Sequence, residues 1–162
     1  MRHRKYKRKF SRTPAHRRAM LSNLLRSLLH YEQIQTTEAK AKTLKSLADR
    51  LISRAQEDTV HARRLVEPMI KDRNLIHKLF HHIGPAAEGE GGGGYVRVVR
   101  TAHRHGDSAS MAVVELVNKT QLYYDRRKAE EEARKAKKEE ARKAAEKARE
   151  AAQAAGGAPV AE

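Results

Sequence analysis

Apolar residues recur at helical spacing along the first part of the chain. One stripe consists of Leu21, Leu24, Leu25, Leu28 and Leu29. A second stripe consists of Ala41, Leu44, Ala48, Leu51, Ile52 and Ala55. Thr13-Pro14 is typical of a helix start, and Thr36-Thr37-Glu38 offers a capping hydroxyl and an acidic first turn. The pattern therefore predicts two amphipathic helices, with a weak strand candidate at residues 31–36 between them.

Two shorter helices are predicted next. Thr59 begins the first, which should end near Glu67 because Pro68 disfavours helical geometry in the residue before it. Asp72 caps the second, whose apolar positions are Leu75, Ile76, Leu79, Phe80 and Ile83. Gly84-Pro85 then predicts the end of that helix.

Residues 95–101 and 109–117 are rich in Val and read as two strands, with Gly106-Asp107 suited to the turn between them. We expect an antiparallel hairpin. The predicted fold is α+β, a two-layer domain with about four helices packed on one face of a short three-stranded sheet. The predicted parts are a basic arm at 1–12, this domain at 13–118 and a charged tail at 119–162.

The tail differs in kind from the domain. Residues 126–155 are almost entirely Ala, Glu, Lys and Arg. Three pairs are spaced for ion pairing within a helix, namely Glu130/Arg134, Glu131/Lys135 and Glu139/Lys143. The apolar residues are nearly all Ala, which provides no coiled-coil seam. The segment is either a lone charged helix or a fraying, partly disordered one.

The excess of basic residues indicates a negatively charged partner. The chain has 35 Lys and Arg against 20 Asp and Glu, a net charge of +15. Its first eighteen residues have no acidic side chain. Their basic side chains are Arg2, His3, Arg4, Lys5, Lys7, Arg8, Lys9, Arg12, His16, Arg17 and Arg18. Such a segment has little to bury and favours a polyanion, since phosphate binding releases condensed counterions. A solvated tail and a nuclear-import or heparin-like patch are the alternatives.

The predicted hairpin adds Arg97, Arg100 and Arg104. Arg97 and Arg100 lie on opposite faces by parity unless a bulge intervenes, so one should point away from the helices toward a ligand. The arginine fork pairs bidentately with phosphate oxygens. The alternative is an exposed strand face that charge keeps soluble.

Other chemistry finds little support. The chain has no Cys, hence no disulfide and no thiolate metal site. His77 and His81 have metal-ligand spacing, but Lys78 stands where a zinc protease needs its glutamate, and His103 and His105 have no acid partner nearby. The glycine run at 88–94 precedes a strand, which predicts a linker and no phosphate loop. We expect no catalytic residues, metal, cofactor, small-molecule substrate or membrane span, and a cytoplasmic protein.

Short motifs along residues 1–118 resemble a known family. They are MRHRK at the start, His16-Arg17, Ala19-Met20, Asn23-Leu24, Thr36-Thr37, Lys40-Ala41-Lys42, Gly93-Gly94-Tyr95-Val96-Arg97, Gly106-Asp107, Met111-Ala112 and Glu115-Leu116-Val117. In order, they resemble bacterial ribosomal protein seventeen of the large subunit. Two positions differ from its usual pattern: Tyr6-Lys7, often a small residue, and Ser110, usually Pro.

The resemblance implies a non-catalytic structural component of the large ribosomal subunit, near the nascent-chain exit. Its partners would be large-subunit ribosomal RNA and neighbouring ribosomal proteins. By resemblance Arg2, His3, Arg4, Lys5, His16 and Arg17 would contact the RNA, with Arg97 and Arg104 less firmly implied. The alternatives are a free nucleoid or regulatory nucleic-acid binder and an RNA-modifying enzyme. No helix-turn-helix spacing supports the first, and no cofactor loop or acid/base set supports the second.

Overall fold

The computed structural model describes residues 8–87 and 93–155, with side chains through residue 143. The chain divides into two compact units between Thr120 and Gln121. The first unit contains α1 (Pro14–Tyr31), β1 (Gln33–Thr37), α2 (Glu38–Ala55), α3 (Val60–Ile70), α4 (Arg73–Lys78), the π-helical turn η1 (Leu79–Ile83), α5 (Gly84–Ala86), β2 (Val96–His103) and β3 (Ser110–Leu116). The second unit contains α6 (Gln121–Ala155).

The two predicted amphipathic helices are confirmed. Thr13 caps α1 by accepting the His16 N–H at 3.4 Å, and the leucines at the end of the predicted stripe are buried. All six stripe residues of α2 are buried. The expected capping hydroxyl of α2 is wrong, because the Thr37 side chain makes no cap hydrogen bond. Glu38 in the first turn supplies the negative charge that this helix end favours.

Helix α3 runs past its predicted end near Glu67. Pro68 lies inside the helix, which continues to Ile70 and ends at Lys71 in a left-handed conformation with φ of 55°. Pro68 is exposed and close to the C-terminal end, so its ring removes one helical hydrogen bond and projects into solvent. Ile70 is fully buried. Burial of that side chain in the core therefore outweighs the local cost of the proline.

The predicted stop at Gly84-Pro85 is also wrong. The chain continues from α4 through η1 into the helical turn α5, and Gly84 has the right-handed φ of −58°. A Cβ on Gly84 would overlap the backbone carbonyl of Ala55. The glycine is thus required by the close approach of α5 to α2 and not by a helix end. Pro85 sits in the first turn of α5, where its missing N–H costs little.

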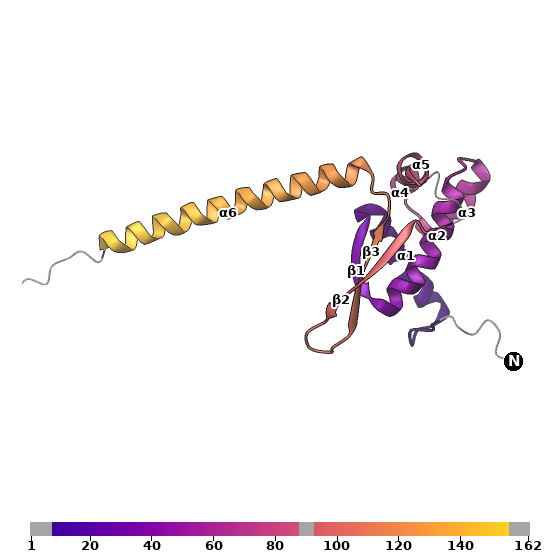
Figure 1. The fold of residues 1–162 in the computed structure, drawn as a ribbon, viewed down its shortest axis with the longest axis horizontal. Coiled ribbons are helices and arrows are strands. Elements are labelled where there is room, and N and C mark those ends of the chain that lie inside the picture. Colours follow the sequence, from indigo (N-terminus) through magenta and orange to yellow (C-terminus); the bar gives the residue numbers. More distant parts are fainter. Residues whose placement is uncertain (1–7, 88–92, 156–162) are drawn as a thin grey trace, which may run out of the picture. The chain divides into compact units, whose positions relative to one another are not determined.

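The sheet is fully antiparallel in the order β1-β3-β2, which confirms the predicted hairpin and the α+β class. Central β3 turns Ala112, Val114 and Leu116 inward, where they are buried. Helices α1 and α2 lie on that side of the strands (Figure 1). A register shift between Arg100 and His103 marks an irregularity before the hairpin turn.

Helix α6 is continuous over 35 residues, or about 50 Å at the helical rise. Of the expected ion pairs, Glu139 with Lys143 is present at 2.8 Å. Glu131 instead pairs with Arg127, one turn earlier, at 3.2 Å. Across the described part of the chain, no helix combines the length and the apolar character that crossing a membrane requires.

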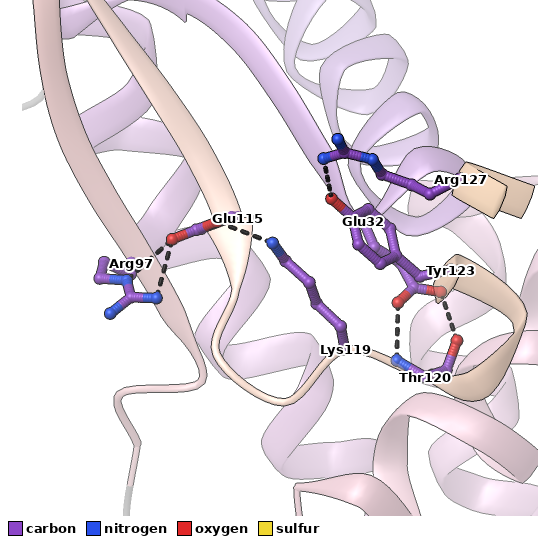
Figure 2. A network of polar contacts seen from close by, with 7 residues as sticks. All are labelled: Glu32, Arg97, Glu115, Lys119, Thr120, Tyr123 and Arg127. Atoms are coloured by element: carbon purple, nitrogen blue, oxygen red, sulfur yellow. Dashed lines mark hydrogen bonds and ion pairs between the residues drawn. The ribbon is translucent and has the colours of Figure 1, made fainter. Parts of the chain in front are cut away.

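A buried carboxylate closes the first unit. Glu32 follows α1 in a left-handed conformation and is fully buried. Its carboxylate lies 2.5 Å from the ammonium of Lys78. The same carboxylate accepts the Thr120 N–H at 2.8 Å and the Thr120 hydroxyl at 2.6 Å (Figure 2). The Glu32 carbonyl accepts the Leu116 N–H at 3.0 Å. One residue thus joins the end of α1, α4 and the segment after β3.

We expect Glu32→Gln to lower the free energy of unfolding by about 3 kcal/mol, because it leaves the mostly buried ammonium of Lys78 without its counter-charge. Gln keeps an oxygen that can accept from Thr120, so the loss is mainly electrostatic. Urea denaturation of the full chain measures it. The double variant Glu32→Gln, Lys78→Met should recover part of the stability. A double variant no more stable than the single one would contradict this account.

Candidate nucleic-acid interface

A basic groove lies between α1 and α2. It encloses about 440 Å³ and its charged lining consists of Arg8, Arg17, Arg18, Lys42 and Arg50. The remaining lining residues are Leu21, Thr43, Ser46, Leu47 and Met69. We call this the α1–α2 groove. No carboxylate is among the described residues that line it.

Sequence spacing explains how the groove forms. Lys42, Ser46 and Arg50 follow one another at intervals of four along α2, so they share one face of the helix. That face is next to the buried stripe that packs against the core. The Arg50 Nε donates to the Ser46 carbonyl at 3.0 Å, which holds the guanidinium stem along the helix. Arg17 and Arg18 supply the α1 side of the groove.

The local field of the groove favours anions. Five cations converge on it, and the first turn of α1 contains no acidic residue to offset the positive end of that helix. Of the groove cations, Lys42 also contacts Glu38, at 2.7 Å. Lys42, by hydrogen bonding, and then Arg100 hold the pKa of Glu38 below its ordinary value. The groove can bind and position phosphate groups through several donors at once.

The structure divides the predicted arm residues into three sets. Arg2, His3, Arg4, Lys5 and Lys7 lie outside the described residues. Arg8, Arg17 and Arg18 line the groove. Lys9, Arg12 and His16 lie at or just before the start of α1, and Lys9 and His16 are exposed. Sequence reasoning missed Lys42 and Arg50. Their spacing on the polar face of α2 was a usable signal, but nothing in it showed that this face would meet α1.

The hairpin arginines are already paired with carboxylates. Arg97 contacts Glu115 at 2.9 Å on the open face of the sheet (Figure 2). Arg100 lies opposite buried Ala112, on the helix-covered side, and contacts Glu38 at 2.8 Å. The expected opposite orientation of these two arginines is thus confirmed.

Arg104 pairs with Asp107 inside the hairpin turn at 2.5 Å. All three hairpin arginines are exposed, at 54 to 74%, although Glu115 and Glu38 are themselves mostly buried. Ion pairs with an exposed partner are weak. A phosphate could therefore displace the carboxylates. The hairpin arginines nevertheless form a less available set of cations than the four arginines of the α1–α2 groove, whose described lining has no carboxylate.

The histidines lie close together on two parts of the fold. The rings of His77 and His81 are 4.2 Å apart, but no group of three or more potential ligands occurs among the described residues. His81 lies 3.4 Å from Arg63, a neighbouring cation that opposes metal binding. His103 Nδ1 lies 3.0 Å from the Ser108 carbonyl, within the hairpin turn. Residues 88–92 of the glycine run fall outside the described residues.

Comparison with known proteins identifies the family. The family model described as Ribosomal protein L17 matches residues 20–117. The chain belongs to the ribosomal protein L17 family. This confirms the resemblance that the short motifs indicated. The matched residues include Lys42 and Arg50 of the groove, whereas α6 begins after them.

Three relatives in the L17 family carry the name large ribosomal subunit protein bL17. That of Maridesulfovibrio salexigens is 46% identical over 134 residues, 82% of this chain and 94% of its own length. That of Thermodesulfovibrio yellowstonii is 44% identical over 133 residues, 82% of this chain and 99% of its own. That of Chloroherpeton thalassium is 43% identical over 122 residues, 75% of this chain and 72% of its own.

The Arg104–Asp107 pair gives a test by pH. Arg104, by hydrogen bonding, and then the Ala109 N–H lower the pKa of Asp107 from 3.8 to about 2. Because the folded pKa lies below the ordinary one, the ionised carboxylate stabilises the turn above about pH 4 and this contribution is lost as the pH falls toward 2.

We expect the Asp107 carboxyl carbon to titrate near pH 2 by NMR in this chain and at a clearly higher pH in Arg104→Gln, still below 3.8 because the Ala109 N–H remains. Arg97→Gln serves as the control, since Arg97 pairs with Glu115 and should leave the Asp107 midpoint unchanged. A midpoint close to 3.8 in the unaltered chain would show that the pair does not form in solution.

Proposed function

We propose that this protein is a non-catalytic structural constituent of the large ribosomal subunit that binds and braces large-subunit ribosomal RNA. The observation that carries the proposal is the α1–α2 groove, in which five cations converge without a lining carboxylate. Family membership and the names of the relatives support the ribosomal assignment. The proposal also includes contacts with neighbouring ribosomal proteins, a position on the nascent-chain exit side and a cytoplasmic location.

The proposed interaction begins in the groove. Arginine side chains such as Arg17 and Arg18 donate two parallel hydrogen bonds to a phosphate, while Lys42 acts as a point charge. Thr43 and Ser46 provide neutral hydroxyls in the same lining. Binding here releases condensed counterions and is therefore sensitive to salt. The rigid packing of α1 and α2 fixes the distance between the two rows of cations.

The proposed contacts extend from the groove along the basic arm and to the hairpin. The full set is Arg2, His3, Arg4, Lys5, Lys7, Arg8, Lys9, Arg12, His16, Arg17, Arg18, Arg97, Arg100 and Arg104, joined by Lys42 and Arg50. RNA is favoured over DNA because folded RNA offers irregular grooves and junctions that an extended basic segment can follow. No cofactor or small-molecule substrate is part of the proposal.

The groove is tested by Arg17→Gln, Arg18→Gln and Arg50→Gln combined in the full chain. We expect the slope of log affinity against log salt for ribosomal RNA to become shallower by about 2 to 3, at roughly 0.7 to 0.9 per lost contact. Filter binding at several KCl concentrations measures the slope. The matched control is Arg54→Gln, Arg64→Gln and Arg73→Gln, which removes the same charge from exposed positions outside the groove.

Equal slopes for the groove variant and its control would mean that net charge alone drives binding. The rival function, a free nucleoid or regulatory protein, is tested in cells. Gradient fractionation of a lysate at high salt should place the protein with large subunits. Recovery in the DNA-containing or free fractions would favour the rival.

A further inference from the structure

The charges of α6 are divided between its faces. Projected at 100° per residue, one face about 120° wide carries six cations. These are Arg127, Lys128, Arg134, Lys135, Lys138 and Arg142, and we call them the α6 basic face. Only one acid, Glu131, falls within the same sector, whereas five acids and three cations occupy the rest of the helix through residue 143. The basic face thus has a net charge of +5 and the remainder −2.

The cations of this face are available to a partner. All of them are exposed. Arg127 pairs with Glu131 at 3.2 Å. Among the side chains that the structure describes, no carboxylate lies within ion-pair distance of Lys128, Lys135 or Lys138. The face is therefore a row of mostly uncompensated positive charge along about four turns of helix.

An aromatic side chain lies on the same face. Tyr124 projects into the sector of the basic face, one turn before Arg127 and Lys128, and is 55% exposed. Its ring meets that of Tyr123 edge to face, with centroids 5.5 Å apart, which limits its orientation. An exposed ring beside a row of cations is the combination that binds single-stranded nucleic acid, where bases stack and phosphates pair.

We propose that the α6 basic face is a second RNA-binding surface, which takes the phosphate backbone along its cations and an unpaired base on Tyr124. A membrane surface fits less well, since an interfacial helix needs a broad apolar face and the small side chains of α6 are mostly alanines. A coiled-coil partner would need a seam of larger apolar residues. The class of partner rests on the RNA-binding function proposed above; the location does not, because α6 lies outside the groove and outside the matched family residues.

The test compares two full-chain variants of equal charge. The first changes Lys128, Lys135 and Lys138 to Gln. The control changes Arg126, Lys137 and Lys143 to Gln, on the other faces of α6. Glutamine is a good helix former, and circular dichroism should show equal helix content for both. The probe is an RNA hairpin with a single-stranded extension of about ten nucleotides. Fluorescence anisotropy measures its binding at several KCl concentrations.

We expect the basic-face variant to make the salt slope shallower by about 2 and to weaken binding at least about tenfold, with a change of less than about 1 in the slope for the control. Tyr124→Leu should weaken binding to the extended hairpin but not to a blunt RNA duplex. Equal effects of the two charge variants would overturn the proposal. Displacement of the RNA from the α6 basic face by vesicles of anionic lipid would also overturn it, provided that the same amount of vesicles leaves RNA binding by the α1–α2 groove unchanged.

The same measurements separate this proposal from that of the groove. The basic-face changes are repeated in a chain that already carries Arg17→Gln, Arg18→Gln and Arg50→Gln. Independent sites give additive losses. If the groove changes leave the salt slope unaltered while the basic-face changes reduce it, the proposed groove function is wrong and the α6 surface stands. If only the groove changes reduce the slope, the α6 proposal is wrong and the groove function stands.

Discussion

The ion pair between the Glu32 carboxylate and the Lys78 ammonium is the interaction on which the first unit depends. It lies where three parts of the chain meet, with Thr120 supplying two further hydrogen bonds. A buried charge that loses its partner is costly, so these segments are held in one arrangement. Together with the buried leucines of α1, it holds the end of that helix in the core, and α1 forms one wall of the α1–α2 groove.

Two other carboxylates of the first unit also contact more than one partner. Glu38 serves both Lys42 and Arg100, and Glu115 serves both Arg97 and Lys119 (Figure 2). In each case one carboxylate offsets two cations at a junction between elements. Neither carboxylate lines the groove, although Glu38 contacts its Lys42. The α1–α2 groove therefore keeps four arginines, Arg8, Arg17, Arg18 and Arg50, that no carboxylate in its described lining offsets.

Local sequence rules predicted the elements well and their limits less well. The leucine stripe of α1, the hairpin and the α+β class follow from periodicity and turn residues. The failures at Pro68 and Gly84 have a common cause: tertiary packing outweighed a local signal. Ile70 is buried beyond the proline, and Gly84 allows α5 to approach the Ala55 carbonyl. Lys42 and Arg50 were missed for a related reason, because spacing along α2 cannot tell which helix it will face.

The positive charges of helix α6 are offset differently from those of the first unit. The first unit offsets cations by shared carboxylates between elements, whereas the two ion pairs described within α6, Arg127 with Glu131 and Lys143 with Glu139, join successive turns of the helix. Pairs such as Glu139 with Lys143 support the helix locally, and its alanines favour helix without requiring a core. Because six cations and only one acid fall in one sector, that sector keeps a net positive charge. Beyond its first turn the apolar residues of α6 are alanines. Such a helix gains little from a protein or lipid surface but much from a polyanion, so its excess positive charge is the basis of the proposed recognition.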